Sequence, residues 1–389
     1  MRFFHLSDLH IGKQLYNYSL IKEQEAILNQ IVAAAEDEVK NRTLDAILIC
    51  GDIYDKSVPS AEAVSLFDIF LTKLNRIEPQ IPLFIIAGNH DSGERLDYGG
   101  NILCNNQIYF SGLPPKTKTE YLRKVTLKDA FGEVNFYMLP FMKPFFVRNV
   151  MADEETNMSY EKAVIEILKR EEIDDTKRNV LLAHQFFVAG GKNPQTSDSE
   201  IKMLGGIDSV DVGAVKEFDY VALGHIHKPQ AMGMQKIRYC GTPLAYSLSE
   251  ENQLKSITVV DLFEKEKEPF ITTIPLEPIH HVRSIKGTLE DVLKQASVEG
   301  AEDYISITLT DEIDPYRPKE RLEEVFHHIL EIRVDNNRTR TILSLEEKEV
   351  ELSEPYEVFE DFFEDMMRRE MSLEEQDYIR KLINEVKEA

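Results

Sequence analysis

The segment 81–91, with the sequence IPLFIIAGNHD, constrains the fold more than any other part of the chain. Its residues 83–87 form a short, unbroken apolar run, which is typical of a strand buried on both faces of a sheet. Gly88 ends the run, and Asn89, His90 and Asp91 follow, with side chains that coordinate ions or exchange protons. We therefore expect a rigid strand that presents reactive groups at its carboxyl end.

Four other apolar runs also end in polar side chains: Arg2–Leu6, Ala46–Cys50, 180–183 and 220–223. The carboxyl ends of parallel strands meet at one edge of a sheet, so these polar groups are expected to converge there. The converging residues are Asp8, His10, Asp52, Asn89, His90, His184, His225 and His227. Five of the ten histidines of the chain belong to this set, which favours a shared chemical role.

Helical patterns over 19–39 and 60–75 separate the first three predicted strands. This β-α-β-α-β order predicts an α/β fold with a doubly wound sheet and helices on its faces. Strand patterns at 107–146, a helix at 159–171 and edge strands up to about 275 complete a first domain, which we place at 1–277.

The strand and helix pattern restarts beyond this point, and a small α/β domain is predicted over 278–340. Its helices are expected at Leu289–Ala296 and 318–330. Residues 341–389 are interpreted as a linker followed by two amphipathic helices, one at 355–369 and one opened by a capping-box sequence at Ser372. Docking on the helices of a partner would cover their apolar faces, and packing on the chain's own core is the alternative.

The charge of the chain is uneven. The formal net charge is −24 over 389 residues, and residues 341–389 hold 16 Asp and Glu against 6 Lys and Arg. A partner that supplies positive charge is therefore expected. The three cysteines are too scattered for a disulfide framework, and neither a signal-peptide pattern nor an 18-residue apolar stretch is present. We expect a cytoplasmic protein without a membrane segment.

The polar set at the strand ends predicts a metal centre. Asp8 and His10 are two positions apart, as are His225 and His227, so on extended segments each pair would point the same way. Seven nitrogen and oxygen donors are too many for one tetrahedral site and suit two ions that share the Asp52 carboxylate. The absence of thiolates argues against structural zinc, and four imidazoles argue against calcium or magnesium. Mn, Fe and Zn stay open, and Mn²⁺ is our first choice.

His90 is not needed as a ligand, so we interpret it as the catalytic acid for a leaving oxygen, with Asp91 placed to orient it. Paired ions would activate water and clamp phosphoryl oxygens. Asp55 is a candidate for fixing the loop after Asp52. His5 is expected to be a hydrogen-bonded core residue and Cys240 a packed one, and His280, His281, His327 and His328 are assigned surface or packing roles.

The motifs Asp8-x-His10, Gly51-Asp52-x-x-Asp55, Gly88-Asn89-His90-Asp91, His184 and Gly224-His225-x-His227 resemble those of the calcineurin-like metallophosphoesterase superfamily, over residues 1–230. Within it, FFHLSDLHIGK, GDIYDKSVPS, HQFFVAGG, GHIHKPQ and CGTPLAYSLSE are similar to the Mre11/SbcD nuclease branch. The resemblance implies a four-layer α/β sandwich, a small α/β capping domain that binds DNA and a C-terminal helical tail. Lys56 and Ser57 stand where the protein-phosphatase branch carries Arg-Gly, so the clamp for monoesters is missing.

The resemblance also implies an activity and partners: a Mn-dependent 3′–5′ double-strand exonuclease and single-strand or hairpin endonuclease, acting in DNA repair, replication and recombination. An SbcC/Rad50-like ATPase would bind the C-terminal helices, and 59–75 with 95–104 would form a homodimer, giving a heterotetramer. By position, one metal would be held by Asp8, His10, Asp52 and His227, and the other by Asp52, Asn89, His184 and His225.

Two other functions stay open from the motifs alone. A phosphatase or cyclic-nucleotide phosphodiesterase for small substrates would use the same two metals but has little need for residues 282–389. A non-catalytic adaptor would have no use for the full set of ligands together with His90. Candidate DNA contacts, chosen because they lie near the motifs, are Lys13, Lys56, Arg95 and Lys228.

Overall fold

Two six-stranded sheets form the body of the protein in the computed structural model, which describes residues 1–41, 44–147, 150, 158–200, 208–296, 300–313, 315–337 and scattered residues between 356 and 383. The first sheet has the order β16-β15-β1-β4-β5-β6. Strands β1, β4, β5 and β6 are parallel, whereas β15 pairs antiparallel with β1 and β16. The bounds are β1 Arg2–Leu6, β4 Ala46–Cys50, β5 Leu83–Ile86, β6 Ile108–Ser111, β15 Ser256–Asp261 and β16 Phe270–Pro275.

The second sheet has the order β13-β14-β12-β9-β8-β7, with β8, β9, β12 and β14 parallel. Its strands are β7 Arg123–Asp129, β8 Gly132–Leu139, β9 Arg178–His184, β12 Tyr220–Gly224, β13 Gln230–Met232 and β14 Met234–Tyr239. The single doubly wound sheet expected from the sequence is therefore two sheets. Strands β9 and β12 belong to the second sheet rather than extending the first.

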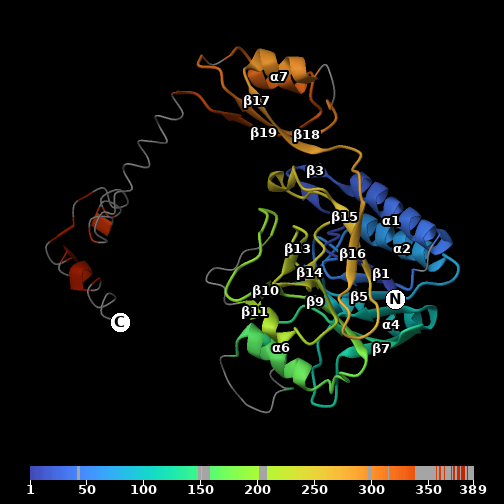
Figure 1. Cartoon of the computed structure of the whole chain (residues 1–389). Helices are drawn as coiled ribbons and strands as arrows, with labels where there is room; N and C mark the ends of the chain where they lie inside the picture. Colours follow the sequence, from blue (N-terminus) through green and yellow to red (C-terminus); the bar gives the residue numbers. More distant parts are fainter. Residues whose placement is uncertain are drawn as a thin grey trace.

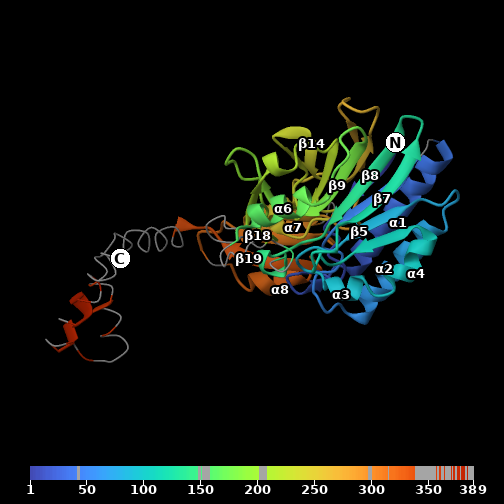
Figure 2. The same cartoon turned by 90° about the horizontal axis from the view of Figure 1, so that it is seen from below.

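The sheets pack face to face around an apolar layer (Figures 1 and 2). Phe84 of β5 stacks on Phe136 of β8 with ring centroids 4.6 Å apart. The alternate residues of β4, such as Ile47, face outward and share a core with Ile31 of α1. Helix α6 covers the second sheet in the same way. The result is a four-layer α/β sandwich, as the resemblance implied.

The helices and short elements of the body connect these strands. Ser60 caps α2 by accepting a hydrogen bond from the backbone of Ala63, and Ser159 caps α6 in the same manner. Their bounds are α1 Ile21–Asn41, α2 Ala61–Asn75, α3 Gly93–Leu96, α4 Gly100–Leu103, α5 Pro144–Val147, α6 Tyr160–Lys169, β2 Gln14–Leu15, β3 Tyr18–Ser19, β10 Phe186–Val188 and β11 Ser209–Asp211, with 3-10 turns at Cys104–Asn106, Val212–Ala214 and Leu248–Glu250.

A separate parallel sheet, β17-β18-β19, follows β16 and lies at the top of Figure 1. Its own apolar core includes Ile307 and Phe326. The helix expected at 318–330 ends at Glu323, because the chain beyond it pairs with β18 from His328 onward. The elements are β17 Val282–Gly287, α7 Leu289–Ala296, β18 Tyr304–Leu309, α8 Pro318–Glu323 and β19 His328–Val334.

The small sheet is attached to the body through α1. The buried Glu23 carboxylate accepts hydrogen bonds from the backbone N–H of Ile279, at 2.9 Å, and from His280 Nδ1, at 2.6 Å. Tyr18 donates to the carbonyl oxygen of Ile329 at 3.3 Å. These contacts join the amino end of α1 and strand β3 to the small sheet near the amino ends of its two edge strands, β17 and β19.

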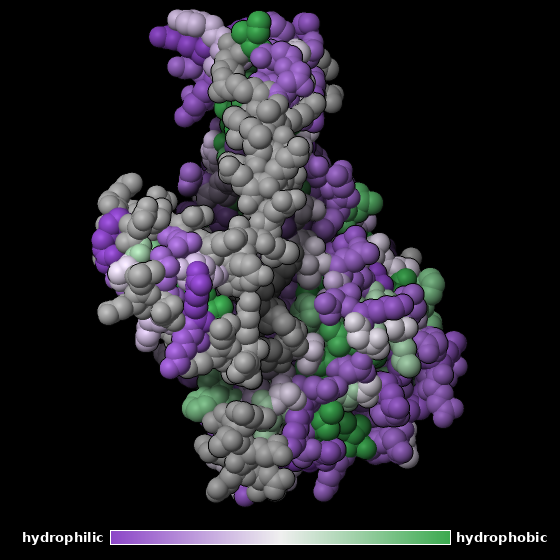
Figure 3. Space-filling model, turned by 90° about the vertical axis from the view of Figure 1, so that its left-hand side faces the viewer, coloured by the Kyte–Doolittle hydropathy of each residue, from purple (hydrophilic) through white to green (hydrophobic). Residues whose placement is uncertain are grey.

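Most of the residues of the two predicted C-terminal helices lie outside the described part of the chain. Among those described, the backbone N–H of Ser372 donates to Glu375 at 2.8 Å and that of Glu375 donates to Ser372 at 3.4 Å, which is the expected capping box. The described helices include none that is long and apolar enough to cross a bilayer. Outside the grey atoms, the face in Figure 3 is mostly hydrophilic, with small, separate hydrophobic patches.

Asp129 is expected to contribute strongly to stability. It pairs with the buried guanidinium of Arg178 and lies 2.6 Å from the amino group of Met1. Asp129→Asn leaves both charges without their partner and should lower the free energy of unfolding by about 3 kcal/mol. Although burial acts to raise it, these partners hold the pKa of Asp129 well below its usual range.

The stabilisation by Asp129 is therefore present in full above about pH 4, the unfolded pKa, and is lost on further acidification. Urea unfolding of the wild type and of Asp129→Asn at pH 7 and pH 3 measures this stabilisation. Asp261→Asn, which affects the looser ion pair with Arg2 at 3.3 Å, is the control. Equal unfolding midpoints for Asp129→Asn and the wild type at pH 7 would contradict the assignment.

Candidate metal centre

The predicted site residues come together where the strands of the two sheets end. Asp8, His10, Asp52 and Asn89 follow β1, β4 and β5 of the first sheet, and His184, His225 and His227 lie at the ends of β9 and β12 of the second. The sequence predicted convergence at the edge of one sheet. In the structure the site is shared by two sheets, which brings donors together from opposite sides.

Backbone conformation aims several of these side chains. Asp8, His10, Asp52 and His225 have φ values of 53°, 42°, 50° and 101° and are four of the nine non-glycine residues with positive φ in the described chain. Such conformations cost energy and concentrate at functional sites. We expected the two-residue spacings to act through extended segments, and the positive φ values show that this expectation was wrong. The chain bends sharply instead, which no local pattern predicts.

Two glycines allow the loops to approach each other. A Cβ at Gly88 would collide with the Asp52 carboxylate, and one at Gly224 would collide with the carbonyl oxygen of Cys50. The glycine that precedes Asn89 and the one that precedes His225 are therefore needed for close packing of the strand ends, not for chemistry.

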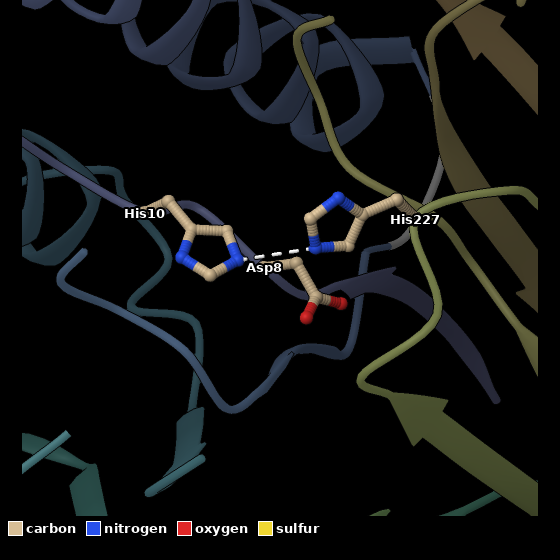
Figure 4. A group of neighbouring side chains, drawn as sticks. All are labelled: Asp8, His10 and His227. Carbon is tan, nitrogen blue, oxygen red and sulfur yellow. Dashed lines mark hydrogen bonds between the residues drawn. The ribbon is translucent and has the colours of Figure 1, made fainter. Parts of the chain in front are cut away.

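The first donor group contains Asp8, His10 and His227, whose donor atoms lie within 4.8 Å of one another. Figure 4 shows Asp8 between the two imidazoles, and Nε2 of His10 is 3.2 Å from Nε2 of His227. Oδ2 of Asp52 is 3.7 Å from Nε2 of His10. Nδ1 of His10, at the opposite side of the ring, is 3.9 Å from Oδ1 of Asp55 and has no hydrogen-bond partner among the described residues. Imidazole nitrogens and carboxylates facing one another in a buried space fit a cation.

A second donor group contains the Asp52 carboxylate, and donor atoms of Asp8, Asp52 and His184 lie within 4.8 Å of one another. Oδ2 of Asp52 is 3.3 Å from Nε2 of His184, and Oδ1 of Asn89 is 3.1 Å from the same nitrogen. Nδ1 of His225 is 2.9 Å from Oδ1 of Asn89. Nδ1 of His184 lies 2.7 Å from the carbonyl oxygen of Cys50, which directs its Nε2 toward the group. Asp52 therefore borders both groups, as a shared ligand must.

Burial sets the protonation of these residues. It lowers the pKa of His225 to about 3 and holds that of His10 well below its usual range, so both imidazoles are neutral and carry a free lone pair. Burial also raises the pKa of Asp8. For His184 burial acts in the opposite direction to the Asp52 carboxylate, which prevails and raises the pKa to about 9. A cation would take the place of that proton.

His90 lies beside the first donor group, with its ring centroid 4.8 Å from that of His10. Its backbone N–H donates to Asp52 at 2.8 Å, and its Nδ1 is 2.9 Å from the carbonyl oxygen of Asp55. Asp91 was expected to orient the His90 ring, but in the structure its carboxylate bonds to backbone groups of two loops. The Asp91 carboxylate accepts the backbone N–H groups of Gly88, Ile53 and Tyr54, at 2.9, 3.1 and 3.0 Å.

Several other residues singled out in the sequence lie outside the two donor groups and have partners of their own. His5 is a buried, hydrogen-bonded residue as predicted, 2.9 Å from the hydroxyl of Tyr220, and Cys240 is buried. Asp55 pairs with Lys13 at 2.8 Å, and Lys228 donates to Gln195. His280 contacts Glu23, His327 pairs with Glu302, and His328 lies against Tyr304.

Sequence reasoning missed the residues behind His227. Ser199, Glu200 and Glu250 contact its ring or backbone. Burial acts to raise the pKa of Glu250, but its hydrogen bond with His227 and the charge of Lys255 hold it well below its usual range. Gln24 donates to the carbonyl oxygen of His10 at 2.7 Å and so supports the first loop from α1.

Comparison with known proteins agrees with this geometry. A family model described as calcineurin-like phosphoesterase matches residues 1–229, so the chain belongs to this family of metal-dependent phosphoesterases. A second model, described as type 5 capsule protein repressor C-terminal domain, matches residues 278–367.

One relative covers nearly the whole chain. It is the SbcD component of the nuclease SbcCD of Staphylococcus epidermidis, to which the chain is 32% identical over 391 residues, or 99% of this chain and 98% of the relative. The resemblance to the SbcD branch is thereby confirmed. Among solved structures, Haemophilus influenzae NAD nucleotidase (NadN) matches with a TM-score of 0.33 and 13% identity, over 84% of this chain and 59% of that one, and carries no weight for function.

Proposed function

We propose that the protein is a DNA nuclease that hydrolyses phosphodiester bonds with two divalent ions, Mn²⁺ by preference. The observation that carries this proposal is the pair of donor groups that meet at Asp52, with His90 beside them. The name of the relative, a component of the nuclease SbcCD, supports DNA as the substrate.

Seven residues would hold the ions in two sets that share Asp52. When bound, such a pair of ions activates water and clamps the phosphoryl oxygens. The first set is Asp8, His10, Asp52 and His227, and the second is Asp52, Asn89, His184 and His225.

The other side chains of the site would handle the proton and the loops. Nδ1–H of His90 donates to the carbonyl oxygen of Asp55 and leaves Nε2 free, so that the imidazolium form of His90 would transfer its Nε2 proton to the leaving oxygen. Asp91 would act as a positioning residue rather than an acid or base, because its carboxylate ties the loop after β5 to the loop after β4.

DNA would reach the site between the body and the small domain. Lys13 and Tyr16 of the body and Ser306 and Arg333 of the small sheet border a common cleft. We therefore propose residues 1–277 as the nuclease domain, 278–340 as a DNA-binding cap and 341–389 as the segment that binds an SbcC/Rad50-like ATPase. Copurification of the ATPase with the full chain, but not with a chain ending at residue 340, tests the last assignment.

A homodimer would pair two sites over one DNA. The exposed apolar side chains around α2 and α4 support it: Val64 is 44% exposed, Ile69 47%, Tyr98 88% and Ile102 72%. Sedimentation equilibrium of the purified chain tests this proposal, and a monomer at micromolar concentration would contradict it. We also place the protein in the cytoplasm, associated with the nucleoid, which cell fractionation checks.

The activity is tested on end-labelled linear duplexes and hairpins with Mn²⁺. We expect 3′–5′ shortening of duplex ends and opening of hairpins, with duplex degradation stimulated by the ATPase and ATP. EDTA should abolish both reactions. Cleavage of cyclic nucleotides or bis-p-nitrophenyl phosphate at a higher kcat/KM than DNA would favour the small-substrate phosphodiesterase instead.

A further inference from the structure

His227 is held on both sides of its imidazole ring. Nε2 belongs to the first donor group, 3.2 Å from Nε2 of His10. On the opposite side Nδ1 lies 2.6 Å from the hydroxyl oxygen of Ser199, which is 2.5 Å from Oε1 of Glu250. On the side away from the donor group the ring is thus connected to a carboxylate through a single hydroxyl, and Nδ1 is also 3.5 Å from Oε1 of Glu250 itself.

The Glu250 carboxylate is fully buried and surrounded by donors. Lys255 Nζ donates to Oε2 at 2.6 Å, the Thr242 hydroxyl donates to the same oxygen at 3.1 Å, and the Ser247 hydroxyl donates to Oε1 at 3.0 Å. An ion pair with a buried ammonium keeps the carboxylate ionised, so Glu250 accepts hydrogen bonds and donates none.

The proton positions follow from this arrangement. Ser199 has a single hydroxyl proton, which goes to Glu250 because that carboxylate only accepts. The oxygen of Ser199 must then accept from His227, so the imidazole proton is on Nδ1. Nε2 consequently carries the lone pair and points it into the donor group, which is the form of histidine that binds a metal.

We propose that Ser199 and Glu250 are positioning residues of the metal centre, which fix the tautomer and orientation of His227. This inference rests on the proposed metal centre. Ser199 lies in the segment between β10 and β11, held at its base by Asp198 N–H to Ser249 Oγ at 2.9 Å and by Gln253 Nε2 to Ser197 Oγ at 3.2 Å. The segment between β10 and β11 therefore supports a proposed ligand that follows β12.

The test is Mn²⁺ binding to the full chain by isothermal titration calorimetry. Ser199→Ala should weaken one of two bound ions about 10–100-fold and leave the other unchanged. Ser199→Thr, which keeps the hydroxyl, should restore binding. Ser197→Ala is the matched control, since this serine is in the same segment and contacts Gln253 rather than His227. Ser199 is only half-buried, so its replacement is expected to leave the thermal unfolding midpoint unchanged.

Glu250→Gln should also weaken the binding of Mn²⁺. Its thermal unfolding midpoint is measured as well, because Lys255 loses its charged partner in this variant. Wild-type affinity for both ions in Ser199→Ala would overturn the inference while leaving the proposed metal centre intact. Equal weakening in Ser197→Ala and Ser199→Ala would also overturn it. If the wild type itself binds no Mn²⁺, the proposed function fails, and this inference with it.

Discussion

Replacing His90 by alanine is expected to stop DNA cleavage while both metal ions still bind. General-acid catalysis is worth roughly 10²–10⁴ in rate, so kcat should fall by about that factor. Metal binding should survive, because the contact of His90 with Asp52 is made by its backbone N–H at 2.8 Å, which alanine retains. Its side chain bonds to the carbonyl oxygen of Asp55 instead.

Asn89→Ala provides the contrast from the adjacent position. Its Oδ1 lies 3.1 Å from His184 and 2.9 Å from His225, so its loss should weaken one ion. Calorimetry with Mn²⁺ and single-turnover cleavage of a labelled duplex separate the two effects. Full activity in His90→Ala would end its assignment as the acid, and loss of an ion there would make it a ligand.

The strands that carry the site could be predicted closely, because strands buried on both faces are continuous apolar runs. β1 and β4 span the residues expected from their sequences, and β5 ends one residue earlier than expected. The helix expected at 318–330 shows the limit. Leu322, Phe326 and Leu330 have helical spacing, yet only the first is in α8, because pairing with β18 prevails over local pattern.

The convergence of the candidate site residues could be predicted from their places at strand ends, but their local geometry could not. The bends at Asp8 and His10 depend on contacts with the neighbouring loop, such as the backbone bond from His10 to Asp52 at 2.9 Å. Ser199 is 28 residues from His227 and 51 residues from Glu250, and no local motif marks Ser199 or Glu250. Long-range side-chain contacts of this kind become visible only in three dimensions.

Asp52→Asn is expected to have the largest effect of any conservative change. Oδ2 of Asp52 is 3.7 Å from His10 in one donor group and 3.3 Å from His184 in the other, so the carboxylate serves both. Asparagine offers one neutral oxygen, and its NH₂ group would face positive ions. Both ions should therefore weaken by more than ~100-fold, beyond the loss caused by removing an outer partner of a ligand. Cleavage should fall to background.

Asp219→Asn is the matched control, because Asp219 precedes β12 at the end opposite to His225. Its carboxylate accepts the backbone N–H of Asn179 at 2.7 Å and pairs with Lys265, away from the donor groups. This variant should bind two Mn²⁺ and cleave DNA like the wild type. If Asp52→Asn lost one ion and kept the other at wild-type affinity, the carboxylate would belong to a single site. The two donor groups would then be independent of each other, and a shared bridging ligand would have to be abandoned.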